Sequence, residues 1–240
     1  MLKSLPDSIL SLVYPQECYI CRGEVEFSDD GVACSGCWNA TKIFTGGETL
    51  CNKCGAFLFG TAPSNSAFCR KCDDHAYDRA FATGLYEKAL SISILHLKKT
   101  PHLSGRVRSL LAGTLERITI ERSTFVVPVP LSSRRLHERG FNQAAIIGKS
   151  ISKYCGFPFD ESSLIRKVHT PMHRAGMDRK ARALTVRNAF EVARPKLLED
   201  RHILLVDDIF TSGETASTCA RILKKSGAAT VNVLTIAHTA

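Results

Sequence analysis

Eight cysteines in four CxxC pairs are the residues of this chain best suited to chemistry, and they fall within 55 residues. Paired thiols at this spacing direct two sulfurs at one tetrahedral centre, so in a cytosolic chain they indicate zinc ligands rather than disulfides. Four thiolates fill the coordination shell of the ion, which predicts structural sites rather than catalytic ones. We assign two consecutive sites, formed by Cys18, Cys21, Cys34 and Cys37 and then by Cys51, Cys54, Cys69 and Cys72.

The spacing alone leaves the pairing of these ligands open. Gaps of 12 residues between the first two pairs and 14 between the last two suit ribbons in which two turns clasp one ion, and we favour sequential pairing. A crossed arrangement, first pair with third and second with fourth, would use the same eight ligands. Cys155 and Cys219 stand alone in apolar helical patterns and are predicted to be small core residues.

A second constellation places two adjacent acids before a small polar turn. Backbone N–H groups at the start of a helix bind phosphate well, and hydroxyls in the turn add donors. The acids suit sugar hydroxyls, a bound Mg²⁺ or a developing cation, so together the two features predict a site for a phosphorylated sugar. The acids are Asp207 and Asp208, and the turn is Thr211, Ser212, Gly213, Glu214 and Thr215, in which the glycine lets the backbone approach a ligand.

These groups need a scaffold, and the hydrophobic pattern after residue 78 is that of an α/β domain. Apolar residues at helical spacing predict helices over 88–99, 104–120, 142–154 and 216–225. Apolar runs predict strands over 125–129, 164–168, 190–192, 201–210 and 230–237, with a basic segment of no clear period over 170–187. The alternation predicts a mainly parallel sheet with flanking helices, which binds ligands at the carboxyl ends of its strands.

Charge divides the 240-residue chain where the cysteine pairs end. Residues 1–78 carry six Lys and Arg against ten Asp and Glu, and residues 79–240 carry 26 against 13, which gives net charges of −4 and +13. We predict an N-terminal helix and double zinc ribbon over 1–78 and a basic domain over 79–240 that meets a polyanion. As separate units, the ribbons should unfold on chelation without the following domain. No apolar run reaches the roughly 20 residues that span a bilayer, so we expect a cytoplasmic protein without membrane insertion.

The stretch Ile203–Thr215 (ILLVDDIFTSGET) resembles the signature of type I phosphoribosyltransferases. With the four CxxC pairs ahead of it, the chain resembles the ComF competence-protein family, a double zinc ribbon joined to a phosphoribosyltransferase domain. Shorter matches are Leu12-Val-Tyr-Pro, His96-Leu97-Lys98, Val129-Pro130-Leu131, the run from Arg134 to Gln143, and Asn188-Ala189-Phe190.

This resemblance implies roles for individual residues. Asp207 and Asp208 would contact the ribose hydroxyls of phosphoribosyl pyrophosphate, and the turn 211–215 would hold its 5-phosphate. The pyrophosphate would lie on the loop made of Leu131, Ser132, Ser133 and Arg134, with Mg²⁺ bridging it to the ribose. For Arg134 the alternative is the exposed start of a helix. The basic segment 170–187 corresponds to the mobile loop that closes over the site in these enzymes.

Two functions stay open at this stage. The first is a phosphoribosyltransferase whose acceptor is unknown, since Thr211 stands where purine-salvage relatives place an acid. The second is a protein of DNA uptake that binds single-stranded DNA through the basic stretch Arg166–Arg187, or senses a nucleotide, without turnover. Partners from the competence machinery are a further implication of the resemblance.

Overall fold

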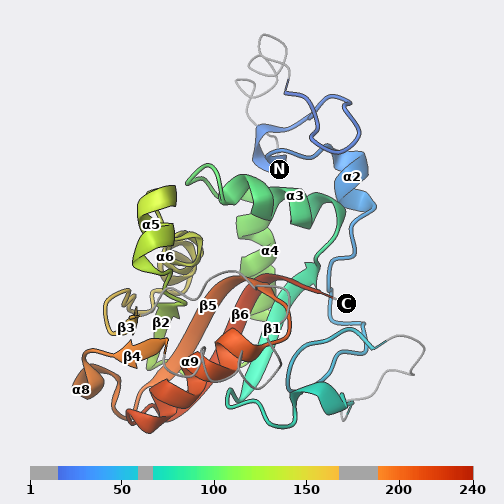
Figure 1. Cartoon of the computed structure of the whole chain (residues 1–240). Coiled ribbons are helices and arrows are strands. Elements are labelled where there is room, and N and C mark those ends of the chain that lie inside the picture. The colour runs from blue at the N-terminus through green and yellow to red at the C-terminus, as the bar shows by residue number, and fades with distance from the viewer. Residues whose placement is uncertain (1–15, 59–66, 168–188, 240) are drawn as a thin grey trace, which may run out of the picture.

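The computed structural model describes residues 16–58, 67–167 and 189–239 (Figure 1). At its centre lies a four-stranded parallel sheet in the order β1-β6-β5-β2. Its strands are β1 (Arg79–Leu85), β2 (Thr124–Pro128), β5 (His202–Phe210) and β6 (Thr230–His238). The two central strands are mostly buried apolar runs, as expected of a parallel sheet covered on both faces.

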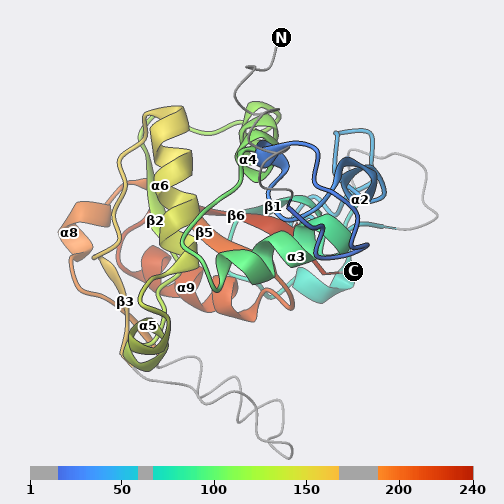
Figure 2. The same cartoon turned by 90° about the horizontal axis from the view of Figure 1, so that it is seen from above.

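Helices cover the two faces of the sheet, with α3 (Lys88–Leu97), α4 (Gly105–Glu116) and α6 (Gln143–Cys155) against one face and α9 (Glu214–Lys225) against the other (Figures 1 and 2). Alternation along β5 separates two apolar cores. Leu204 and Val206 join the core of α3, α4 and α6, whereas Ile203 and Leu205 join the core of α9. Asp207 and Asp208, which follow these residues, therefore point toward opposite faces.

Shorter elements complete the described chain. The helices are η1 (Ser28–Asp30), α2 (Ser35–Asn39), η2 (Arg70–Cys72), α5 (Ser133–Arg139) and α8 (Pro195–Leu198). Two further strands, β3 (Leu164–Arg166) and β4 (Phe190–Val192), form a separate antiparallel pair.

The predicted fold class, a parallel sheet with flanking helices behind a Cys-rich double ribbon, is confirmed. The helices and strands predicted after residue 78 all have counterparts within a few residues, but β3 and β4 pair with each other, antiparallel and outside the main sheet. No strand is expected from the sequence over β1, whose RAFATGL run is rich in small residues. The predicted N-terminal helix and the basic segment 170–187 lie outside the described residues.

The cysteine region shares both cores of the α/β domain. Cys18 and Trp38 belong to the core of α3 and α4, while Cys51, Cys72 and Tyr77 belong to the core of α9. The predicted boundary at residue 78 stays a prediction, but the apolar contacts on either side of it are continuous. These shared cores argue against separate unfolding of the two parts.

Both edges of the sheet are covered by irregular chain. On β1, Phe44 donates its backbone N–H to Thr83 O (2.8 Å) and Leu85 donates to Lys42 O (2.9 Å), so the link between the two cysteine groups runs antiparallel to the strand. On β2, Val126 donates to Pro158 O (2.8 Å), and Val126 O accepts from Asp160 N–H (3.0 Å).

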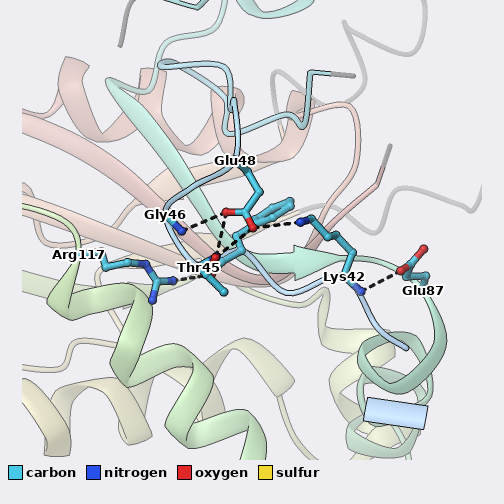
Figure 3. A network of polar contacts seen from close by, with 7 residues as sticks. Lys42, Thr45, Gly46, Glu48, Glu87 and Arg117 are labelled. Atoms are coloured by element: carbon cyan, nitrogen blue, oxygen red, sulfur yellow. Dashed lines mark hydrogen bonds and ion pairs between the residues drawn. The ribbon is translucent and has the colours of Figure 1, made fainter. Parts of the chain in front are cut away.

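A polar network built around Glu48 anchors the link between the cysteine groups (Figure 3). Glu48 accepts from Lys42 Nζ (3.1 Å) and from the backbone N–H groups of Thr45 (2.9 Å) and Gly46 (3.0 Å). Arg117, the residue that follows α4, donates to Phe44 O (2.8 Å), which fixes the residue just before Thr45. Burial opposes ionisation of Glu48, but Lys42 and the two amides outweigh it and lower the pKa of its carboxyl to about 2.

Candidate functional site

The eight paired thiols form two separate groups of four, Cys18, Cys21, Cys34 and Cys37 and then Cys51, Cys54, Cys69 and Cys72. Within each group all Sγ atoms lie within 4.8 Å of one another, so the pairing is sequential, as favoured from the spacing.

The size of each thiol group fits a tetrahedral ion. Measured Sγ–Sγ separations are 3.8 Å for Cys18 and Cys37, 3.5 Å for Cys21 and Cys34, and 3.7 Å for Cys51 and Cys72. Zinc–sulfur bonds of about 2.3 Å imply tetrahedral edges of about 3.8 Å, whereas a disulfide bond is about 2.05 Å long. The two groups therefore have the donor set and dimensions of Cys₄ zinc sites, which supply stability and leave no open coordination position.

The first CxxC pair of each group is built on the same turn. Arg22 donates its N–H to Cys18 O (3.0 Å), and Gly55 donates to Cys51 O (2.8 Å). Each of these residues directly follows the second cysteine and has a left-handed backbone, with φ of 67° at Arg22 and 71° at Gly55. This turn brings both thiols of the pair to one side of the chain.

The acid pair lies at the carboxyl end of β5, where alternation separates the two side chains. Asp208 is buried, and its Oδ2 lies 3.2 Å from Lys98 Nζ and accepts from Gln143 Nε2 (3.3 Å). Asp207 Oδ1 accepts the N–H of Asp208 (2.9 Å). Desolvation, and then the charge of Asp208, raise the pKa of Asp207 well above its usual range, although Lys98 opposes this.

Arg166 of β3 brings a second cation to this end of the sheet. Its guanidinium lies 5.1 Å from the centre of the Phe190 ring, which is a cation–π distance. Burial, and then the charge of Arg135, lower the pKa of Arg166, while Asp207 acts in the opposite direction. Arg166, placed with the DNA-binding stretch by the sequence analysis, is thus electrostatically coupled to Asp207.

Two residues of this site carry no role in the sequence analysis. Lys98 and Gln143 appear there only within matched motifs, yet both contact Asp208. Gln143 is buried, and its Oε1 has no hydrogen-bond partner among the described residues, so a donor from outside the chain would fit beside the acids. Long-range pairing of this kind leaves no local signal in the sequence.

The polar turn after β5 is open to solvent. Thr211, Ser212 and Glu214 are exposed, and Thr215 is half-buried. Gly213 caps α9 with a left-handed backbone (φ 76°), which a glycine adopts without strain. Because α9 begins shortly after β5 ends, the free N–H groups of its first turn lie at the carboxyl end of the sheet, where the acid pair also lies. Phosphate binding by this turn stays a prediction.

The loop after β2 lies at the same carboxyl end of the sheet, because Pro128 pairs with Val206 in the parallel register. Ser132 is buried and caps α5 by accepting from Arg135 N–H (3.4 Å), whereas Ser133 is exposed. Arg134 pairs with Glu138 (2.8 Å) at the exposed start of α5, the alternative considered for it. The predicted role of Leu131, Ser132, Ser133 and Arg134 in holding pyrophosphate is untested.

The chain is similar in sequence to known proteins, first of all in its cysteine region. Residues 9–74 match the double zinc ribbon domain family, so the chain is a double zinc ribbon protein with a parallel α/β domain. It is 30% identical to DNA utilization protein YhgH of Salmonella typhimurium, across 95% of this chain and 99% of that protein.

Two more distant relatives are competence protein F of Haemophilus influenzae and competence protein ComFC of Bacillus subtilis. The first is 28% identical across 92% of this chain and 96% of that protein. The second is 25% identical across 91% of this chain and 93% of that protein. The chain belongs to the family of these competence and DNA utilization proteins, as the resemblance to ComF predicts.

Solved structures give a weaker likeness. Glutamine phosphoribosylpyrophosphate amidotransferase from B. subtilis, complexed with ADP and GMP, aligns over 56% of this chain and 28% of its own, with a TM-score of 0.37 and 16% identity. A structure of the allosteric regulatory enzyme of purine biosynthesis aligns over 56% of this chain and 27% of its own, with a TM-score of 0.36 and 22% identity.

Within the described residues, no helix has the length and apolar character needed to cross a bilayer.

Proposed function

We propose that this chain binds phosphoribosyl pyrophosphate with Mg²⁺ at the carboxyl ends of β2 and β5, as a phosphoribosyltransferase-type protein in the handling of DNA. One observation carries the proposal: two residues after the acid pair, β5 ends and an exposed hydroxyl turn opens α9. Carboxylates suit sugar hydroxyls and Mg²⁺, and the start of a helix suits phosphate. The signature resemblance supports the same ligand.

The residues take separate parts of this ligand. Asp207 and Asp208 accept from the ribose hydroxyls, the turn 211–215 holds the 5-phosphate, and the loop 131–134 holds the pyrophosphate. Lys98 and Gln143 orient Asp208, because both contact its Oδ2. The carboxylates of Asp207 and Asp208 would hold Mg²⁺, which would supply positive charge next to the pyrophosphate. A cation bound here would oppose the raised pKa of Asp207, since a nearby positive charge favours the ionised form of a carboxyl.

The experiment is calorimetry with phosphoribosyl pyrophosphate, with and without Mg²⁺, on the wild type and on the Asp207→Asn/Asp208→Asn double variant. A hydrogen bond to a charged partner contributes about 1.5–3 kcal/mol. Losing two of them should weaken binding by roughly two to four powers of ten. Asp200→Asn is the matched control, because this exposed aspartate lies just before the opposite end of β5. No binding by the wild type, or equal affinity in the double variant, would remove the proposal.

A second candidate function, binding of single-stranded DNA, is favoured by the net charge of +13 over residues 79–240. The names of the relatives, which refer to competence and DNA utilization, point the same way. Fluorescence anisotropy with a labelled oligonucleotide tests it, and affinity should fall with salt at a logarithmic slope of about −0.7 per phosphate contact. Displacement of the DNA by phosphoribosyl pyrophosphate would place both ligands at one site. Absence of binding at low salt rejects this function.

A further inference from the structure

We propose that His75, a residue of the second cysteine ribbon, is a positioning residue for the phosphate turn 211–215. The inference rests on the proposed function of that turn and extends it. His75 lies more than 130 residues before the turn in sequence. It has no role in the sequence analysis, because it follows the last zinc-ligand pair and belongs to no motif.

The ring of His75 packs directly against the backbone of the turn. A Cβ atom added to Gly213 would lie 2.7 Å from His75 Cε1 and 2.9 Å from His75 Nδ1. The same atom would lie 2.7 Å from Cζ of Phe210, the last residue of β5. Side chains from the ribbon and from the sheet therefore enclose Gly213, and its left-handed backbone is held on two sides.

The ring of His75 is in turn fixed by its own neighbours. Its Nδ1 lies 2.6 Å from the hydroxyl of Tyr77, which is almost fully buried. The Tyr77 ring meets the Phe210 ring edge-on, with the ring centres 5.7 Å apart. Three residues after Cys72, the ribbon thus begins a segment in which Tyr77 contacts both His75 and Phe210, at the base of the turn.

The ribbon segment is also bound to α9 itself. Ala76 donates its N–H to Ser217 Oγ (3.0 Å), in the first turn of the helix. Asp78 accepts from Val231 N–H (2.7 Å) and pairs with Lys224 (2.6 Å) near the other end of α9. The segment 75–78 is therefore fastened to the helix at two points, so the His75 ring holds a fixed place beside the turn.

This arrangement assigns part of the phosphate site to the ribbon. A phosphate needs several N–H groups of the turn aimed at one point, and small displacements of such donors cost much of the affinity. Removal of the His75 ring leaves Gly213 free on one side, so the turn samples conformations that do not bind. The affected ligands should be those that carry the 5-phosphate.

The experiment is calorimetry on His75→Ala with three ligands: phosphoribosyl pyrophosphate, ribose 5-phosphate and inorganic pyrophosphate. The variant should lose at least about tenfold in affinity for the first two, while inorganic pyrophosphate, which the loop 131–134 is proposed to hold, should bind as in the wild type. His102→Ala is the matched control, because His102 is exposed and lies just before α4, on the other side of the sheet. Zinc content and melting temperature are recorded for each protein.

The outcomes separate the possible failures. Unchanged affinity for ribose 5-phosphate in His75→Ala, or an equal loss for all three ligands, overturns the inference. A wild type that binds neither phosphoribosyl ligand removes the proposed function and the inference together. If His75→Ala does not fold, Tyr77→Phe removes only the hydroxyl that holds the ring, and it should show a smaller loss of the same pattern. An identical profile for Tyr77→Phe and wild type would then overturn the inference.

Discussion

Glu48→Gln should lower the free energy of unfolding at neutral pH, because it removes the charge at the centre of the network in Figure 3. The pKa of Glu48 falls from 4.5 to about 2 on folding, because Lys42 and two backbone N–H groups outweigh the effect of burial. At about 1.4 kcal/mol per pH unit this shift corresponds to about 3 kcal/mol. Lys42 is 42% exposed, and solvent screening reduces its share, so we expect about 2 kcal/mol.

The sign of the pH dependence follows from the direction of the shift. A carboxyl whose pKa is lowered in the folded state contributes stability above its unfolded pKa, and the contribution is lost as pH falls through the folded pKa. The difference between wild type and Glu48→Gln should therefore be full at pH 7 and shrink below about pH 4.5. Urea unfolding of the zinc-loaded proteins across this range measures it.

A matched control lies in the same network. Glu87→Gln replaces a half-buried carboxylate that accepts one hydrogen bond, from Lys42 N–H (2.9 Å), and it should cost well under half as much as Glu48→Gln. Loss of zinc in acid acts on all three proteins and cancels in their differences. A Glu48→Gln protein within about 0.5 kcal/mol of wild type at pH 7, the range of ordinary surface substitutions, would refute this account, as would a difference independent of pH.

Three further perturbations test the fold and the site. Metal analysis should give about two zinc ions per chain. Chelation should unfold the sheet together with the ribbons, because they share cores. A circular dichroism spectrum that still shows the sheet after chelation would contradict this. Asp207→Asn should raise the melting temperature at pH 7, where desolvation and the neighbouring charge of Asp208 disfavour the Asp207 carboxylate. This gain in melting temperature should vanish below about pH 4, where the carboxyl is protonated in the unfolded chain as well. Gly84→Ala should loosen the link between the cysteine groups and speed its proteolysis, since the added Cβ would lie 2.3 Å from Lys42 O; Gly47→Ala, with open space around it, should not.

Local pattern was enough to predict the elements that carry their own signal. The apolar run over 201–210 corresponds to β5, and the polar turn after it opens α9 two residues earlier than predicted. The CxxC spacing favoured the correct ligand sets, because each ribbon closes within a short segment. β1 gave no such signal, since its small residues are selected by close packing against β6 and against the link beside it rather than by alternation.

Contacts between distant segments account for what the sequence analysis did not predict in the site. Lys98 reaches Asp208 from the end of α3 and Gln143 from the start of α6, and neither lies near β5 in sequence. From the sequence, Gly213 was expected to let the backbone approach a ligand closely. In the structure, the atoms around it belong to the rings of His75 and Phe210. The sequence places these residues in separate motifs, and only the packing of the ribbon on α9 brings them together.

The link that runs along β1 covers an edge of the sheet, and the two zinc sites at its ends should keep it there. Residues 42–44 are held between the two cysteine groups and occupy the outer hydrogen-bonding edge of the sheet. When zinc is scarce, the groups no longer anchor this link, and because the ribbons share both cores with the sheet, β1 loses its cover and its neighbours together and exposes its N–H and C=O groups to other chains. Exposed strand edges recruit further strands, so the metal-free protein should be prone to self-association and to capture by chaperones. Zinc supply would then limit how much of the protein stays usable.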